Sequence, residues 1–315
     1  MKSKVTVIGG GTGLSVILRG LKKIPDIELS AVVTVADDGG STGRLREQYQ
    51  IPAMGDMRSV ILALSEEEGL FNSLMNYRFD GEEDIGGHNL GNLILTALTQ
   101  ISGSFNEAID SICKVLNVKG NIYPATNEVI SLYALMDDGV VVKGEHNIPE
   151  YQHHIQRVFY DHDVSANLHA VEAIRQADLL ILGIGSLYTS ILPNLIIDSI
   201  STAFRENKGK KIYLCNAMSQ SGETDGYSVE DHVQAIHEHL GAAVLDLVVV
   251  NKTVIPDEIL AKYHVENSHA IRLHEASHPY QILEEELLDL RQSLVRHDEQ
   301  KLAQIIADIL KESGL

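Results

Sequence analysis

The chain has 315 residues, 44% of them hydrophobic and 22% charged, which is typical of a globular protein and not of a disordered one. Its 25 basic and 44 acidic residues give a formal net charge of −19, which argues against nucleic acid or an anionic membrane surface as a partner. Two cysteines in no metal-binding spacing, and no apolar stretch near the roughly 18 residues of a membrane span, lead us to expect a cytoplasmic protein.

A glycine-rich run directly follows the first predicted strand. Apolar residues 5–8 lead into Gly9-Gly-Gly-Thr-Gly13, and a helical pattern begins at Leu14. Glycines let the backbone approach a ligand closely, and the helix start behind them directs free N–H groups and partial positive charge toward that ligand. The run predicts a phosphate site at Gly10, Gly11, Thr12 and Gly13. It matches neither a P-loop nor the complete dinucleotide fingerprint, so a tight turn without a ligand is the alternative.

The second predicted strand, 29–36, ends in a loop that begins with two adjacent carboxylates, Asp37 and Asp38. In dinucleotide folds an acid at this position accepts hydrogen bonds from a ribose, whereas two carboxylates beside a phosphate loop also suit Mg²⁺. An Asx turn without a ligand is the third interpretation. Ser41 and Arg44 follow as candidate phosphate contacts, with pairing of Arg44 to Glu47 or Asp56 as the alternative for the arginine.

Helical patterns then dominate up to residue 117. One helix is expected to begin near Asp56, and others over 69–79, 89–101 and 104–117. The segment 86–93 places a histidine and two amides at a helix start, namely His88, Asn89 and Asn92. These side chains either donate to a phosphate, with His88 as a candidate general acid, or form a capping cluster that satisfies backbone groups.

The middle of the chain changes character. A hairpin over 129–143 and a strand over 155–160 predict a β-rich insertion or edge subdomain at 119–162. The α/β pattern resumes with a helix at 168–176 and a buried strand at 177–182. Further strands are expected at 211–215 and 244–250, and the tail 280–315 is predicted to be helical.

Polar loops follow the strands of the second half as well. Residues 183–190 contribute the candidates Gly185, Ser186 and Tyr188, and the run 215–225 contributes Asn216. The alternation of strands and helices predicts one domain over 1–315, with a Rossmann-like, doubly wound and mainly parallel sheet. Because ligands of such sheets bind beyond the carboxyl ends of the strands, we expect the exits at 9–13, 37–43, 183–190 and 215–226 to converge on one crevice.

Six ordered blocks over residues 5–240 resemble the CofD-like superfamily and, within it, the gluconeogenesis factor family. They are Gly9–Gly13, Ala36–Arg46, Gly55–Arg58, Gly87–Leu93, Gly185–Leu195 and Gly222–Gly226. The resemblance implies a Rossmann-like core that binds a UDP-sugar, notably UDP-N-acetylglucosamine, and a role in regulating carbon flow to cell-wall precursors and cell shape. By the same resemblance, Tyr263 and Arg296 match positions tied to UDP-sugar binding. Two departures are Ile184, where the family usually has proline, and Ser59, where it has asparagine.

Two classes of function remain open, and the regulator is favoured. The resemblance implies a nucleotide-sugar ligand, a protein partner in cell-wall precursor synthesis and no required cofactor. The alternative is a transferase of the 2-phospho-L-lactate type that uses Mg²⁺ on Asp37 and Asp38 with a nucleotide-linked donor. The sequence offers no obvious nucleophile or acid–base pair beyond His88, which favours binding over catalysis. NAD(P) binding is a further alternative, and a homo-oligomer is left open.

Overall fold

A seven-stranded parallel sheet forms the centre of the protein, as the computed structural model shows for residues 2–66, 69–81, 85–274, 277–291 and 294–314. The strand order is β10-β9-β8-β7-β1-β2-β3. The bounds are β1 Ser3–Gly9, β2 Ile27–Val33, β3 Asn121–Pro124, β7 Leu179–Leu182, β8 Lys210–Leu214, β9 Leu247–Asn251 and β10 Gln281–Glu285. The chain leaves at β3 and returns beside β1 as β7, so the order reverses between β1 and β7, where doubly wound sheets bind ligands. The predicted α/β fold class is confirmed.

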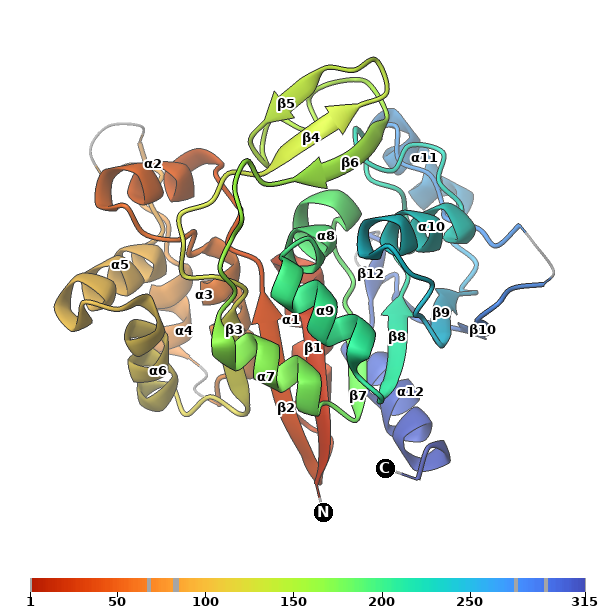
Figure 1. Cartoon of the computed structure of the whole chain (residues 1–315), viewed down its shortest axis with the longest axis horizontal. Coiled ribbons are helices and arrows are strands. Elements are labelled where there is room, and N and C mark those ends of the chain that lie inside the picture. Colours follow the sequence, from red (N-terminus) through yellow and green to blue (C-terminus); the bar gives the residue numbers. More distant parts are fainter. Residues whose placement is uncertain (1, 67–68, 82–84, 275–276, 292–293, 315) are drawn as a thin grey trace.

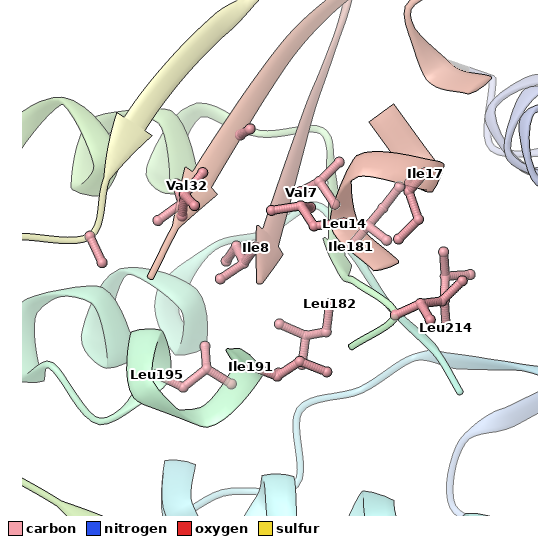
Figure 2. Close-up of a cluster of buried hydrophobic side chains, with 14 of the residues drawn as sticks. Val7, Ile8, Leu14, Ile17, Val32, Ile181, Leu182, Ile191, Leu195 and Leu214 are labelled. Carbon is pink, nitrogen blue, oxygen red and sulfur yellow. The ribbon is translucent and has the colours of Figure 1, made fainter. Parts of the chain in front are cut away.

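Helices cover both faces of the sheet, and this explains the uninterrupted apolar strands. Residues 179–182 of β7 are fully buried, as expected of a strand with helices on each side. On one side α1 (Gly11–Leu21) packs against α3 (Gly55–Leu64) and α12 (Glu299–Glu312); α7 (Leu168–Gln176) packs against α9 (Asp198–Glu206). In Figure 1, α7 and α9 cross in front of the strands. Figure 2 shows a cluster of buried core side chains from β1, β2, α1, β7 and β8 and from the helical segment 187–195 that follows β7.

The remaining helices flank the two halves of the sheet. The predicted helices of the first half appear as α4 (Leu70–Asn76), α5 (Leu90–Ser102) and α6 (Phe105–Val115), preceded by α2 (Gly40–Tyr49). In the second half, a π-helical turn at Leu187–Ile191 continues into α8 (Leu192–Leu195), followed by α10 (Val229–Leu240) and α11 (Asp257–Val265). Across the described parts of the chain, no helix is long and apolar enough to cross a membrane.

A small antiparallel sheet makes up the β-rich segment. Its strands are β4 (Tyr133–Met136), β5 (Val141–Lys143) and β6 (Ile155–Phe159), in the order β5-β4-β6. Figure 1 shows it above the end of the main sheet opposite the N-terminus, which is the carboxyl end of β1. The predicted boundary at residue 119 is wrong, because residues 121–124 form β3 and pair with β2 in the main sheet. We call residues 133–159 the insertion.

The C-terminal segment is only partly helical, which corrects the prediction for 280–315. Residues 281–285 form β10 and pair in parallel with β9, and a short ribbon follows from β11 (Leu288–Asp289) and β12 (Arg296–His297). The run Gln-Ile-Leu-Glu-Glu suits a helix or an edge strand equally, and hydrogen bonding to the open edge of β9 decides for the strand. Helix α12 then packs so tightly on α1 that a Cβ on Gly20 would lie 2.2 Å from the carbonyl oxygen of Glu299.

Candidate functional site

The glycine loop between β1 and α1 fits closely against other parts of the protein. Gly11 has φ +67°, a conformation that favours glycine, and a Cβ on Gly13 would lie 2.2 Å from the carbonyl oxygen of Ile184 in the loop after β7. Two of the four glycines are therefore required by backbone geometry and packing, whether or not a ligand binds.

A carboxylate of the protein itself faces the start of α1. Asp56, in the first turn of α3, accepts a hydrogen bond from the Gly11 N–H, and a Cβ on Gly10 would lie 2.5 Å from its Oδ2. Burial, the largest cause, raises the pKa of Asp56 to about 6. The expected anion at this helix start is thus partly supplied by Asp56, while Thr12 and Gly13 line an open cavity on the other side of the loop.

The adjacent carboxylates Asp37 and Asp38 have different surroundings. Asp37 accepts from the Gly39 N–H at 2.9 Å, and its pKa is raised by burial first and also by the charge of Asp38. Its charge in turn raises the pKa of Asp56, so these two carboxyl groups lie near each other. Asp38 instead accepts from the His146 N–H at 3.1 Å and lies 3.9 Å from Arg46 Nη1. Asp38 therefore ties the second loop to the insertion.

The proposed metal pair, Asp37 and Asp38, gathers no third ligand within the part of the chain that the structure describes. Among the described residues, one group of three has metal-ligand atoms within 4.8 Å of one another, and it comprises Asp137, Asp138 and His153 on the insertion. All three are exposed, and each nitrogen of His153 faces a carboxylate, with Nδ1 2.9 Å from Asp137 Oδ1 and Nε2 3.6 Å from Asp138 Oδ2. Their spacing is already explained by these ion pairs.

Two further acids enter the crevice, and neither is among the predicted site residues. Glu223, 6% exposed, accepts hydrogen bonds from the Ser186 hydroxyl, the Thr189 hydroxyl and the Tyr188 N–H. Glu145 of the insertion hydrogen-bonds to Thr189, and burial together with the charges of Asp37, Glu223 and Asp56 raises its pKa to about 8. Carboxyl groups from four separate segments therefore share one small region.

Residues 144–149, which we call the strap, cross this region and contact both of its sides. On one side His146 bonds to Asp38. On the other, a Cβ on Gly222 would lie 1.9 Å from the carbonyl oxygen of Pro149, so the loop after β8 also packs directly against the strap. The expected convergence of the strand exits is therefore observed, but the space where they meet is covered by the insertion.

The predicted residues after β7 and β8 hold these exits together. The amide of Asn216 accepts from the Gly185 N–H at 3.1 Å and donates to the Gly185 carbonyl at 2.7 Å. Ser186 caps the π-helical turn, and the Tyr188 hydroxyl lies 2.8 Å from the Tyr227 hydroxyl, with only 2% of Tyr188 exposed. Asn216, Ser186 and Tyr188 therefore hold the backbone of these two loops in place, and their polar atoms already bond to other groups of the protein.

The segment 86–93 caps a helix, and its histidine lies near two arginines. Asn89 caps α5 by accepting from the Asn92 N–H, and Asn92 Oδ1 accepts from Arg58 at 3.1 Å, so the capping interpretation describes these two amides. His88 is 7% exposed, and burial followed by the charges of Arg44 and Arg78 lowers its pKa. Arg44 donates to the Gly86 carbonyl at 2.6 Å and pairs with neither Glu47 nor Asp56; Ser41 lies 3.3 Å from Arg78.

A cavity of about 610 Å³ opens on the far side of the glycine loop. Its lining includes Thr12 and Gly13 at the start of α1, Ile184 after β7, and Arg296 of β12. Tyr263 of α11 accepts a hydrogen bond from the Val295 N–H at 2.8 Å through its hydroxyl oxygen. Two residues that are 33 positions apart in the sequence are therefore brought together, with Tyr263 holding the residue next to Arg296.

Comparison with known proteins gives a consistent family. The CofD family, described as 2-phospho-L-lactate transferase CofD, matches residues 5–288. The gluconeogenesis factor of Bacillus subtilis (strain 168) is 45% identical over 315 residues, which cover 99% of each chain. The putative gluconeogenesis factor of Thermotoga maritima is 43% identical over 97% of this chain and 99% of its own. A crystal structure of a Bacillus halodurans protein has a TM-score of 0.94 at 42% identity, over 98% of this chain and 100% of that one. The chain therefore belongs to the CofD family, in the branch whose members are named gluconeogenesis factors.

Proposed function

We propose that the protein binds a UDP-sugar, with UDP-N-acetylglucosamine as the first candidate, and regulates carbon flow to cell-wall precursors and thereby cell shape. The observation that carries the proposal is the cavity between the glycine loop and Arg296. N–H groups at a helix start and a guanidinium are the donors that diphosphates require, and this cavity offers both.

The charge of Arg296 supports this assignment. Within the described part of the chain its side chain forms no hydrogen bond or ion pair, whereas the neighbouring Arg291 pairs with Asp289 at 2.7 Å and Arg19 with Glu299 at 3.3 Å. An unpaired guanidinium facing a helix start has its fork of donors available for an anionic ligand. Tyr263 acts in this proposal as a positioning residue, because its hydroxyl holds the backbone beside Arg296.

Calorimetry with UDP-N-acetylglucosamine tests the proposal. We expect Arg296→Ala to weaken binding about tenfold or more, since charge-assisted hydrogen bonds contribute roughly 1.5–3 kcal/mol. Tyr263→Phe should weaken it less, because the ring and its packing remain. Arg205→Ala, an exposed arginine on α9, serves as the matched control and should bind like the wild type. Equal affinity for the wild type and Arg296→Ala, or no saturable binding by the wild type, would contradict the assignment.

A transferase is the second candidate, and the buried carboxyl groups favour it. Mg²⁺ prefers carboxylate oxygens and bridges phosphates, and the charge of Asp37 raises the pKa of the nearby Asp56. These two residues would hold the ion, whereas Asp38 is engaged by His146 and Arg46. When bound, Mg²⁺ would neutralise charge on a diphosphate. Product formed from a UDP- or GDP-linked donor with Mg²⁺ would establish transfer, and no product from either donor would leave the regulator.

A further inference from the structure

Two arginines, Arg44 and Arg78, lie at the α2 and α5 side of the crevice. Arg44 Nη2 donates to the Gly86 carbonyl at 2.6 Å, and Arg78 Nη1 donates to the Gly87 carbonyl at 2.6 Å. Within the described ranges, neither arginine forms an ion pair, although the chain carries a net charge of −19. Each guanidinium has five N–H donors, and these contacts occupy few of them.

His88 lies beside these two arginines. The side chain is 7% exposed, and its Nδ1 is buried with no hydrogen-bond partner among the described atoms. Burial and the charges of Arg44 and Arg78 lower its pKa, so these surroundings favour the neutral imidazole. The Ser41 hydroxyl adds a fourth polar group, 3.3 Å from Arg78 Nη1. Both arginines also hold the loop that carries His88, because each donates to a carbonyl of residues 86–87. These contacts keep the two guanidinium groups next to the histidine.

We propose that Arg44, Arg78 and His88 form a second anion subsite, which takes the phosphate group of a phosphorylated small molecule and is separate from the nucleotide cavity. Two guanidinium groups, an imidazole and a hydroxyl offer more donors than the two oxygens of a carboxylate can accept, whereas a phosphate monoester presents three terminal oxygens. The subsite goes beyond the proposed function, because it needs no nucleotide.

The separation from the nucleotide cavity follows from the elements that carry each site. Arg44 lies on α2 and His88 just before α5, whereas the cavity around Arg296 is lined by the start of α1, β12 and the start of α12. Figure 1 places α2 and β12 on opposite sides of β1. Asp37 and Asp56 lie at the loop ends between these groups, as their contacts with Gly39 and Gly11 show. Two anions bound on either side would both flank this pair of carboxyl groups.

Nitrogen-15 NMR of the His88 ring in the full chain tests the subsite, with inorganic phosphate as the probe. We expect saturable shifts of the ring signals at millimolar phosphate and constant ionic strength, and a rise of about one unit in the pKa of His88, because a bound anion opposes the two arginine charges. Arg44→Ala and Arg78→Ala should each weaken phosphate binding about tenfold or more. Both side chains are exposed, and Arg44→Lys, which keeps the charge, should retain part of the affinity.

Controls make each outcome decisive. Arg205→Ala removes one exposed positive charge elsewhere and Arg296→Ala alters the nucleotide cavity; both should leave phosphate binding at the wild-type value. If the His88 signals of the wild type do not saturate with phosphate, the subsite does not exist. If Arg205→Ala weakens phosphate binding as much as Arg44→Ala does, the effect is one of general charge screening, and the subsite is again contradicted. Displacement of phosphate by UDP-N-acetylglucosamine overturns the separateness of the two sites. If the nucleotide fails to bind while phosphate still shifts His88, the proposed function fails and the subsite stands.

Discussion

Single residues in the glycine loop are constrained by the protein as much as by any ligand. Gly13 shows this most directly, because the Ile184 carbonyl oxygen occupies the place of a side chain. Glycine-rich loops after a first strand are commonly attributed to phosphate binding, yet here the closest approach is made by the neighbouring loop. The pattern predicts where a turn lies, and it does not distinguish a ligand from protein backbone as the reason for glycine.

Gly13→Ala is expected to destabilise the fold. A Cβ 2.2 Å from a carbonyl oxygen forces a backbone shift, which costs about 1–3 kcal/mol in overpacked sites. Gly9→Ala is the matched control, because its nearest neighbour would be an ordinary 3.9 Å away. Thermal unfolding should show a lower Tm for Gly13→Ala and a smaller change for Gly9→Ala. If Gly13→Ala were as stable as the wild type, the loop could yield without cost and the packing argument would be wrong.

Asp37 and Asp38 show which part of a site a sequence pattern can predict and which part it cannot. An apolar run followed by a polar loop predicts that they follow a strand, and they do follow β2, although β2 ends at Val33 and not at residue 36. Asp37 accepts a hydrogen bond from Gly39, two positions away, whereas Asp38 accepts one from the backbone N–H of His146, 108 positions along the chain. A local pattern contains no information about such partners, and the same holds for Glu145, which lies in a segment with no functional motif.

Among the elements, the insertion affects the site most, because it covers the crevice where the strand exits meet. The alternating pattern of the hairpin predicted its strands, and the structure contains them as β4 and β5. That they cover the crevice follows from contacts between distant segments, such as Pro149 with Gly222. Edge strand β10 gives the same lesson, since its short mixed run becomes a strand only because β9 offers an unpaired edge.

The strap gives the protein a specific pH dependence. The pKa of Glu145 is raised from 4.5 to about 8 in the folded state, so between these values the folded protein binds more protons than the unfolded one. Stability therefore falls as pH rises through this window, and the loss is complete above about pH 8. Glu145→Gln cannot ionise, so its Tm should decline less between pH 5 and 8 than that of the wild type, by about 2–4 °C for each 1 kcal/mol that the wild type loses.

Glu150→Gln, an exposed position of the insertion, is the control for that comparison and should follow the wild-type curve. Parallel curves for the wild type and Glu145→Gln would show that Glu145 titrates as an ordinary surface carboxyl group, and the covered crevice would then be open to water.

For the whole molecule, ligand binding should appear as added stability. A ligand at 100 times its Kd stabilises the folded state by about 2.7 kcal/mol, which corresponds to a Tm increase of several degrees. We expect UDP-N-acetylglucosamine to produce this increase in the wild type and a smaller one in Arg296→Ala. Parallel samples with GDP, NAD and NADP, each with and without Mg²⁺, compare the alternatives. An increase with NADP alone would support dinucleotide binding and contradict the UDP-sugar.

Helix α12, from the last part of the described chain, packs directly on α1, from its first part. Gly20 of α1 lies against Glu299 of α12. The cavity at the glycine loop therefore has one wall made early in translation and another made late. A nascent chain on the ribosome would expose the loop well before Arg296 and α12 emerge, so the cavity would be complete only after both had been synthesised.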